Sequence, residues 1–120
     1  MGRSVVKAFL DTYAMVDLLE GRDRFRPYLK DCVTNHFNLL EMHVQGCRVR
    51  DESIADVAFS RMRSAAIPIE ADDVLAASRI KRMVKGASYA DALGYAMAQR
   101  RKIPFITGDK AFRGLPGVLP

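Results

Sequence analysis

Four side chains have the residue types and positions for chemistry: the carboxylates of Asp11, Glu41, Asp91 and Asp109. Asp11 and Asp109 each closely follow a short apolar run typical of a buried strand, whereas Glu41 and Asp91 lie in segments with helical periodicity. Carboxylates that come within a few Å of one another repel, so they are stable together only with a proton or a cation between them. Their oxygens suit hard cations such as Mg²⁺, which also keeps positions for water and for substrate phosphate. The four acids therefore predict a metal-dependent enzyme that acts on phosphate esters.

The rest of the chain is basic, with 19 Lys and Arg against 14 Asp and Glu in 120 residues and a formal net charge of +5. The cations gather in three clusters: Arg22, Arg24 and Arg26; Arg79, Lys81, Arg82 and Lys85; Arg100, Arg101 and Lys102. Cations near helix ends also complement the helix dipole, so the clusters alone leave nucleic-acid binding open. An acidic centre in a basic chain nevertheless favours a polyphosphate substrate. The candidates for holding its flanking phosphates are Arg79, Arg82, Arg100 and Arg113.

Strands that alternate with helices must position these acids. The sequence predicts strands at residues 5–10, 32–34, 67–69, 103–107 and 118–119, helices at 14–21, 27–30, 36–46, 53–65, 74–86 and 90–101, and helix caps at Thr12, Asn35 and Ser88. This order predicts one α/β domain over residues 1–120 with a mostly parallel sheet. Ligands of such sheets collect at the carboxyl ends of the strands. Asp11 and Asp109 therefore meet if their strands are neighbours, and Asp91, in the first turn of its helix, reaches the same edge.

Each acid also has an ordinary structural explanation. Asp91 is placed as a capping-box acid after Ser88, Asp109 as a turn residue, and Asp11 as an acid at a helix N-terminus. Glu41 is the least expected of the four, because an acid on an apolar helix face is costly unless it reaches solvent, is paired or protonated, or binds a cation. No single acid is persuasive, but four at converging positions favour a joint site.

Four sequence segments carry a resemblance to a known family: residues 5–12, 34–41, 88–98 and 106–118, which end in or contain Asp11, Glu41, Asp91 and Asp109. In this order they resemble the PIN-domain nucleases, and in particular the stand-alone VapC-type toxin ribonucleases of VapBC toxin-antitoxin pairs. The resemblance implies a three-layer α/β/α sandwich and an acidic quartet formed by the four carboxylates. Asp11, Asp91 and Asp109 would be direct ligands of Mg²⁺ or Mn²⁺, with Thr12 and Thr107 as supporting polar neighbours. Tyr13 departs from the pattern, because many members have a small polar residue there.

The resemblance also implies an activity and partners. The activity would be metal-assisted hydrolysis of RNA phosphodiester bonds. A small antitoxin protein would bind the chain and inhibit it, and two copies of the chain would form a homodimer. The open alternative is a non-catalytic PIN-type scaffold that binds RNA or protein. A phosphatase of the haloacid dehalogenase type is disfavoured, because it needs a second Asp two positions after Asp11, where this chain has Tyr13.

The sequence predicts no membrane contact. No segment approaches the roughly 20 apolar residues of a membrane span, and Lys7 and Asp11 interrupt the apolar run that a signal peptide would need. We therefore expect a cytoplasmic protein.

Overall fold

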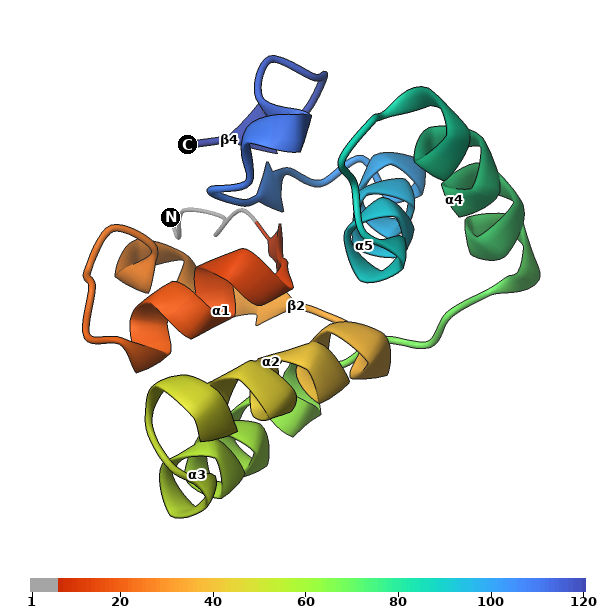
Figure 1. The fold of residues 1–120 in the computed structure, drawn as a ribbon. Helices are drawn as coiled ribbons and strands as arrows, with labels where there is room; N and C mark the ends of the chain where they lie inside the picture. Colours follow the sequence, from red (N-terminus) through yellow and green to blue (C-terminus); the bar gives the residue numbers. More distant parts are fainter. Residues whose placement is uncertain (1–6) are drawn as a thin grey trace, which may run out of the picture.

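A computed structural model describes residues 7–120, which form a parallel four-stranded sheet with helices on both faces (Figure 1). The strands are β1 (Ala8–Leu10), β2 (Cys32–Val33), β3 (Phe105–Ile106) and β4 (Val118–Leu119), in the order β2-β1-β3-β4. Phe9 of β1 pairs with Val33 on one side and with Phe105 on the other. The two strands that precede Asp11 and Asp109 are therefore direct neighbours, as the site required. The expected strand residues Val5 and Val6 lie outside the described residues.

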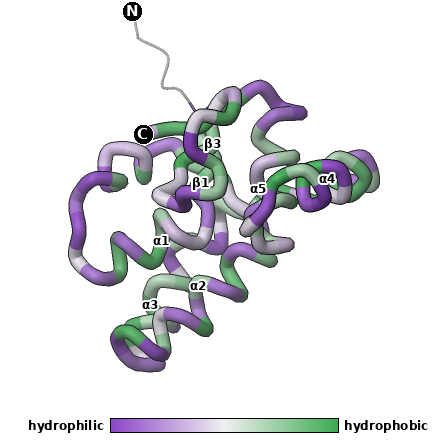
Figure 2. The backbone as a smooth tube through the Cα atoms, turned by 45° about the horizontal axis from the view of Figure 1, so that its top comes forward, coloured by the Kyte–Doolittle hydropathy of each residue, from purple (hydrophilic) through white to green (hydrophobic). Residues whose placement is uncertain are grey.

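Within residues 7–120 the α-helices are α1 (Thr12–Leu19), α2 (His36–Val49), α3 (Glu52–Met62), α4 (Ala71–Met83) and α5 (Tyr89–Arg100), with α3 packed on α2 and α4 packed on α5. Three short 3₁₀ helices span Arg26–Asp31, Arg63–Ala65 and Lys110–Phe112. Hydrophobic and hydrophilic segments alternate along α3 and α4 (Figure 2), as expected for helices that bury one face. None of the helices within residues 7–120 has both the length and the hydropathy to cross a bilayer.

The core has one cluster on each face of the sheet, because side chains alternate along a strand. Leu10 and Ile106 pack with Met15 of α1 and Met42 of α2 on one face. Phe9 and Phe105 pack on the other face, with Tyr95 of α5 and Phe112 among the aromatic rings there. The three-layer α/β/α arrangement is therefore confirmed.

Several local predictions were wrong. Residues 67–69 form no strand; the sheet edge is extended instead by a single bridge between Thr34 and Ala66, after which Pro68 cannot donate a hydrogen bond. The cap of α1 is Asp11 and not Thr12, since Asp11 Oδ1 accepts the Ala14 N–H at 2.8 Å. The helix expected at 74–86 begins earlier and ends earlier, at Ala71 and Met83, and its cap is Glu70, whose backbone N–H donates to Asp73 in a capping box. The expected caps Asn35 and Ser88 are confirmed.

Candidate active site

Asp11 lies at the carboxyl end of the central strand β1, where it is fully buried. One of its oxygens caps α1, and the other, Oδ2, is buried without a hydrogen-bond partner. Burial raises the pKa of Asp11 well above its ordinary value, and the charges of Asp91 and Asp109 raise it further. The Thr107 hydroxyl and the Ala14 N–H lower this pKa in part. Asp11 is thus a carboxyl group that lacks a partner for its charge.

Asp91 and Asp109 lie beside Asp11 and interact with each other. Ser88 caps α5 by accepting the Asp91 N–H at 3.0 Å, which places the Asp91 side chain in the first turn. Burial raises the pKa of Asp91 to about 7, with further contributions from a side-chain hydrogen bond with Asp109, from the Asp109 charge and from the charge of Glu41. Among the described residues no hydrogen bond joins the Ser88 N–H to the Asp91 carboxylate, so Asp91 does not complete a capping box, and its buried Oδ1 has no partner.

Asp109 is held by the turn that leaves β3. Its backbone N–H donates to Thr107 Oγ1 at 2.9 Å, and its own Oδ1 accepts the Ala111 N–H at 3.0 Å. Asp109 is therefore a turn residue as well as a neighbour of Asp91. Thr107 supports this geometry, in agreement with its expected position beside the acids.

Glu41 reaches the same region from the middle of α2. Its Oε1 accepts the Thr12 hydroxyl at 3.3 Å, and Asn38, one turn earlier on α2, donates from Nδ2 to Thr12 Oγ1 at 3.0 Å. Glu41 is half-buried, so it does not simply extend into solvent. The structure thus brings all four sequence-predicted acids, and both threonines, to one edge of the sheet.

Asn38 was missed by the sequence analysis. It is fully buried, and among residues 7–120 its Oδ1 is the third buried side-chain oxygen without a partner, after those of Asp11 and Asp91. Its position three residues before Glu41 puts both side chains on the same face of α2, which is the signal that could have identified it.

The donor set fits a hard cation. Three buried oxygens without partners, two of them from carboxyl groups, are costly in a folded protein unless they meet a proton, water or a cation. Carboxylate and amide oxygens are also the ligand types that Mg²⁺ and Mn²⁺ prefer. Within residues 7–120, however, no three or more His, Cys, Asp or Glu side chains are already grouped as ligands of one ion. The acids are coupled by charge, and an ion would have to draw them closer.

The expected phosphate-holding cations differ in availability. Arg100 donates to Asp73 at 2.6 Å and to Glu70 at 3.2 Å, so its charge is used in packing α4 on α5. Arg113, in contrast, lines a small cavity together with Thr107 and Asp109. Arg24 lines the same cavity, although the sequence analysis did not single it out for this role.

A comparison with protein-family models identifies one family. The family model described as PIN domain matches residues 8–118. Among curated protein sequences, none matches this chain significantly. A chain of a toxin-antitoxin complex from Klebsiella pneumoniae is 25% identical over 94% of this chain and 96% of its own length, with a TM-score of 0.74.

Two further solved structures share the fold at lower identity. One is VapC20 of Mycobacterium tuberculosis, a toxin that cleaves the sarcin-ricin loop, with 18% identity, a TM-score of 0.74, and coverage of 92% of this chain and 96% of that one. The other is PAE2754 from Pyrobaculum aerophilum, with 17% identity, a TM-score of 0.68, and coverage of 95% and 90%.

Proposed function

Because the chain belongs to the PIN-domain family, we propose that it is a metal-dependent endoribonuclease and the toxin of a toxin-antitoxin pair. One observation carries the proposal: Asp11 and Asp91 each keep a buried carboxyl oxygen without a partner, at the edge of the sheet where Glu41 and Asp109 also lie. Such an arrangement is unfavourable for stability alone and is suited to binding a divalent cation. The net charge of +5 supports a polyanionic substrate.

Asp11, Asp91 and Asp109 would hold Mg²⁺ or Mn²⁺. When bound, the ion supplies charge neutralisation at the phosphate and a more acidic water. The Thr12 hydroxyl donates to Glu41, and Asn38 in turn donates to Thr12, so Glu41 is positioned to orient a water or to accept its proton. Asp109, tied to the β3 turn by Thr107 and Ala111, completes the site on its other side.

Cleavage of RNA by the purified protein tests this proposal. Short single-stranded and structured RNAs are incubated with Mg²⁺, Mn²⁺ or EDTA, for the wild type and for Asp91→Asn. We expect cleavage that EDTA abolishes, and a loss of at least about 100-fold in Asp91→Asn, since even outer-shell changes at metal sites cost up to about that much. Asp72→Asn is the matched control, because the Asp72 side chain is 76% exposed and its ion-pair partner is Arg100, at 3.8 Å. Equal cleavage by the wild type and Asp91→Asn would reject the assignment.

The same samples separate an enzyme from a non-catalytic scaffold. A catalytic site should give a Mn²⁺-dependent rise in melting temperature that Asp91→Asn removes. RNA binding with neither cleavage nor a cation-dependent melting temperature would identify a scaffold instead.

The partner we propose is a small antitoxin protein. Support comes from the Klebsiella pneumoniae neighbour, which was solved in a toxin-antitoxin complex. Further support is an open groove of about 420 Å³ between α1, α2 and α3, whose lining is mostly apolar and includes Leu18, Met42, Ile54 and Val57. We also propose a homodimer, which sedimentation of the purified chain would test.

A further inference from the structure

The three arginines that follow α1 all form ion pairs, but they differ in where they lie. Arg22, whose side chain is exposed, pairs with the nearly buried Asp17 and with Glu20, and Arg26 pairs with the exposed Asp23. Arg24 also pairs with Asp17, but it lines the cavity that contains Asp109. Only one member of this basic cluster is therefore placed beside the candidate active site.

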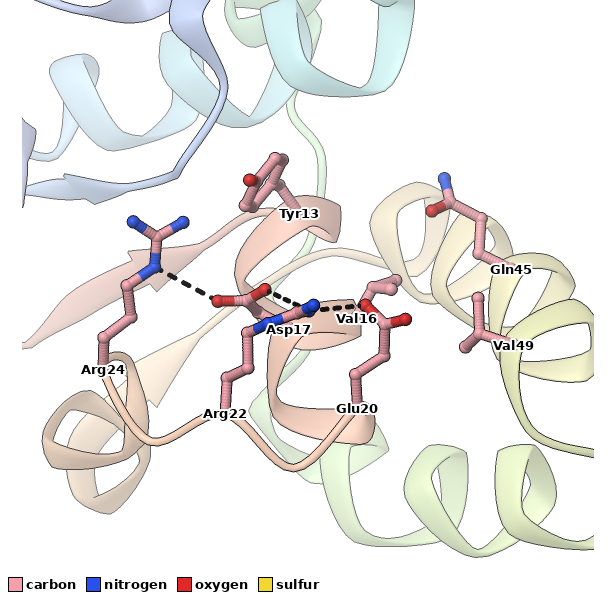
Figure 3. A pocket seen from close by; sticks show the side chains of 8 residues that line it. All are labelled: Tyr13, Val16, Asp17, Glu20, Arg22, Arg24, Gln45 and Val49. Carbon is pink, nitrogen blue, oxygen red and sulfur yellow. Dashed lines mark hydrogen bonds and ion pairs between the residues drawn. The ribbon is translucent and has the colours of Figure 1, made fainter.

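Arg24 is fixed in a defined orientation. Its Nε donates to Asp17 Oδ2 at 3.1 Å, and the Asp17 side chain is only 7% exposed, so this anchor is nearly buried. The guanidinium lies 4.5 Å from the centre of the Phe25 ring and 5.7 Å from that of Tyr13. Figure 3 shows that the two terminal nitrogens of Arg24 point away from Asp17, on the side of Tyr13. Among residues 7–120 these nitrogens donate no hydrogen bond, so the outer edge of the guanidinium is available.

Gly108 allows Arg24 to come close to the acids. A Cβ at this position would collide with the Arg24 guanidinium and with the Tyr13 ring. Gly108 lies between Thr107 and Asp109, so Arg24 contacts the backbone directly before one of the proposed metal ligands. Tyr13, the residue that departs from the family pattern, is packed against the same glycine.

The cavity beside Arg24 has the size and charge for an anion. It encloses about 110 Å³ and is lined by Arg24, Arg113 and the Thr107–Asp109 turn, and also by Leu119 and Pro120. This volume is enough for a few water molecules or one phosphate group. Two arginines provide planar donors that match phosphate oxygens. The Asp109 carboxylate would repel an anion in the part of the cavity next to it. A bound anion would therefore lie close to the two arginines.

We propose that Arg24 and Arg113 form a phosphate subsite that binds the RNA backbone next to the phosphodiester that is cleaved. This inference rests on the proposed function and adds to it a fixed position for the neighbouring phosphate. Asp17 accepts the hydrogen bond from Arg24 Nε, and the two terminal nitrogens of the guanidinium stay available for two phosphate oxygens. The subsite thus binds backbone rather than base, and it orients the chain of RNA across Asp109.

RNA binding without divalent ions tests the subsite independently of cleavage. A fluorescent single-stranded RNA is titrated with wild type, Arg24→Gln, Arg113→Gln and the control Arg26→Gln in EDTA, at several salt concentrations. We expect Arg24→Gln and Arg113→Gln each to weaken binding about tenfold and to reduce the slope of log K against log salt by about 0.7, the value for one phosphate contact on a single strand. Arg26→Gln, whose partner Asp23 is exposed, should change neither quantity. Arg24→Lys should restore the salt slope but not the full affinity.

Cleavage kinetics with Mg²⁺ form the second arm. Arg24→Gln should raise KM about tenfold while kcat stays within a few-fold of the wild type, because the subsite binds ground state and transition state alike. The inference is overturned if Arg24→Gln behaves like Arg26→Gln in the binding titration, or if the wild type binds no RNA. If the wild type binds RNA through Arg24 but does not cleave it, the proposed function fails and the phosphate subsite stands. Circular dichroism of each variant confirms that the compared proteins are folded.

Discussion

Asp11 has two roles that a mutation can separate. Its Oδ1 caps α1 through the Ala14 N–H, whereas its Oδ2 is buried without a partner. The first role stabilises the helix and needs only an acceptor. The second destabilises the fold in the absence of a cation, because a buried carboxylate lacks compensation. Asp11 therefore contributes to both folding and the proposed chemistry, with opposite effects on stability.

Asp11→Asn and Asp11→Ala should differ in stability although both lose activity. Asparagine is a good N-cap, so Asp11→Asn keeps the cap and removes the charge, and its melting temperature should equal or exceed that of the metal-free wild type. Asp11→Ala loses the cap as well and should be less stable than Asp11→Asn by about 1 kcal/mol. Thermal unfolding in EDTA measures both. A lower melting temperature for Asp11→Asn than for Asp11→Ala would contradict this account.

At the scale of elements, α4 is attached to α5 by one buried acid. The Asp73 side chain is 0% exposed and accepts hydrogen bonds from Arg100 at 2.6 Å and Arg101 at 2.9 Å. Burial alone would raise the pKa of Asp73, but the two arginines and the Glu70 N–H hold it well below its usual range. Arg100 and Arg101, at the end of α5, therefore have a structural role. Their positions in the sequence alone could not distinguish this role from substrate binding.

Removing Asp73 should loosen the α4–α5 pair. Asp73→Ala leaves Arg100 and Arg101 without their main partner and breaks the capping box with Glu70. We expect a loss of about 2–4 kcal/mol, somewhat below the cost of breaking a fully buried pair because the arginines are partly exposed. Urea unfolding gives the value, with Asp72→Ala as the neighbouring exposed control. A loss under about 0.5 kcal/mol, typical of surface changes, would show that the ion pairs contribute little.

Some helix caps and strands could be predicted from the sequence, and others could not. Asn35 and Ser88 were identified as caps because a cap depends on residues three positions apart. At Asp11-Thr12 two adjacent residues can each cap, and only the end of β1 decides between them. Residues 67–69 have strand-like composition. Whether they pair with β2 depends on where the chain lies after α3 and the 3₁₀ helix that follows it, and there only Ala66 meets Thr34. The convergence of the four acids followed from strand order, whereas the contact of Arg24 with Gly108 depends on side chains far apart in sequence.

For the molecule as a whole, the acids should make stability depend on pH. Burial, and then neighbouring carboxylates, raise the pKa of Asp11 well above 3.8 and that of Asp91 to about 7. In the unfolded chain both titrate near 4, so the folded protein binds more protons than the unfolded one between about pH 4 and 7. The contribution of these groups is therefore fully present below about pH 4 and is lost as the pH rises through 7.

The metal-free wild type should accordingly lose stability between pH 5 and pH 8. We expect a decrease in the free energy of unfolding on the order of 2 kcal/mol. In Asp91→Asn the decrease should be smaller, because one of the titrating groups is gone. Asp73 does not offset this trend, since its lowered pKa affects stability only in more acidic solution. Calorimetry in EDTA at constant ionic strength measures the effect, and a wild-type stability that is constant or rises over this range would contradict it.

The position of Leu119 and Pro120 in the lining of the cavity beside Arg24 has a practical consequence. A tag attached directly after Pro120 would begin beside the lining of the proposed phosphate subsite. A polyhistidine or acidic tag placed there could compete with RNA or bring its own metal ligands to the acids. Protein for the titrations and cleavage assays should therefore carry a removable tag at the other end of the chain. Comparing the RNA affinity of the two tagged forms would show how much a tag after Pro120 interferes with the subsite.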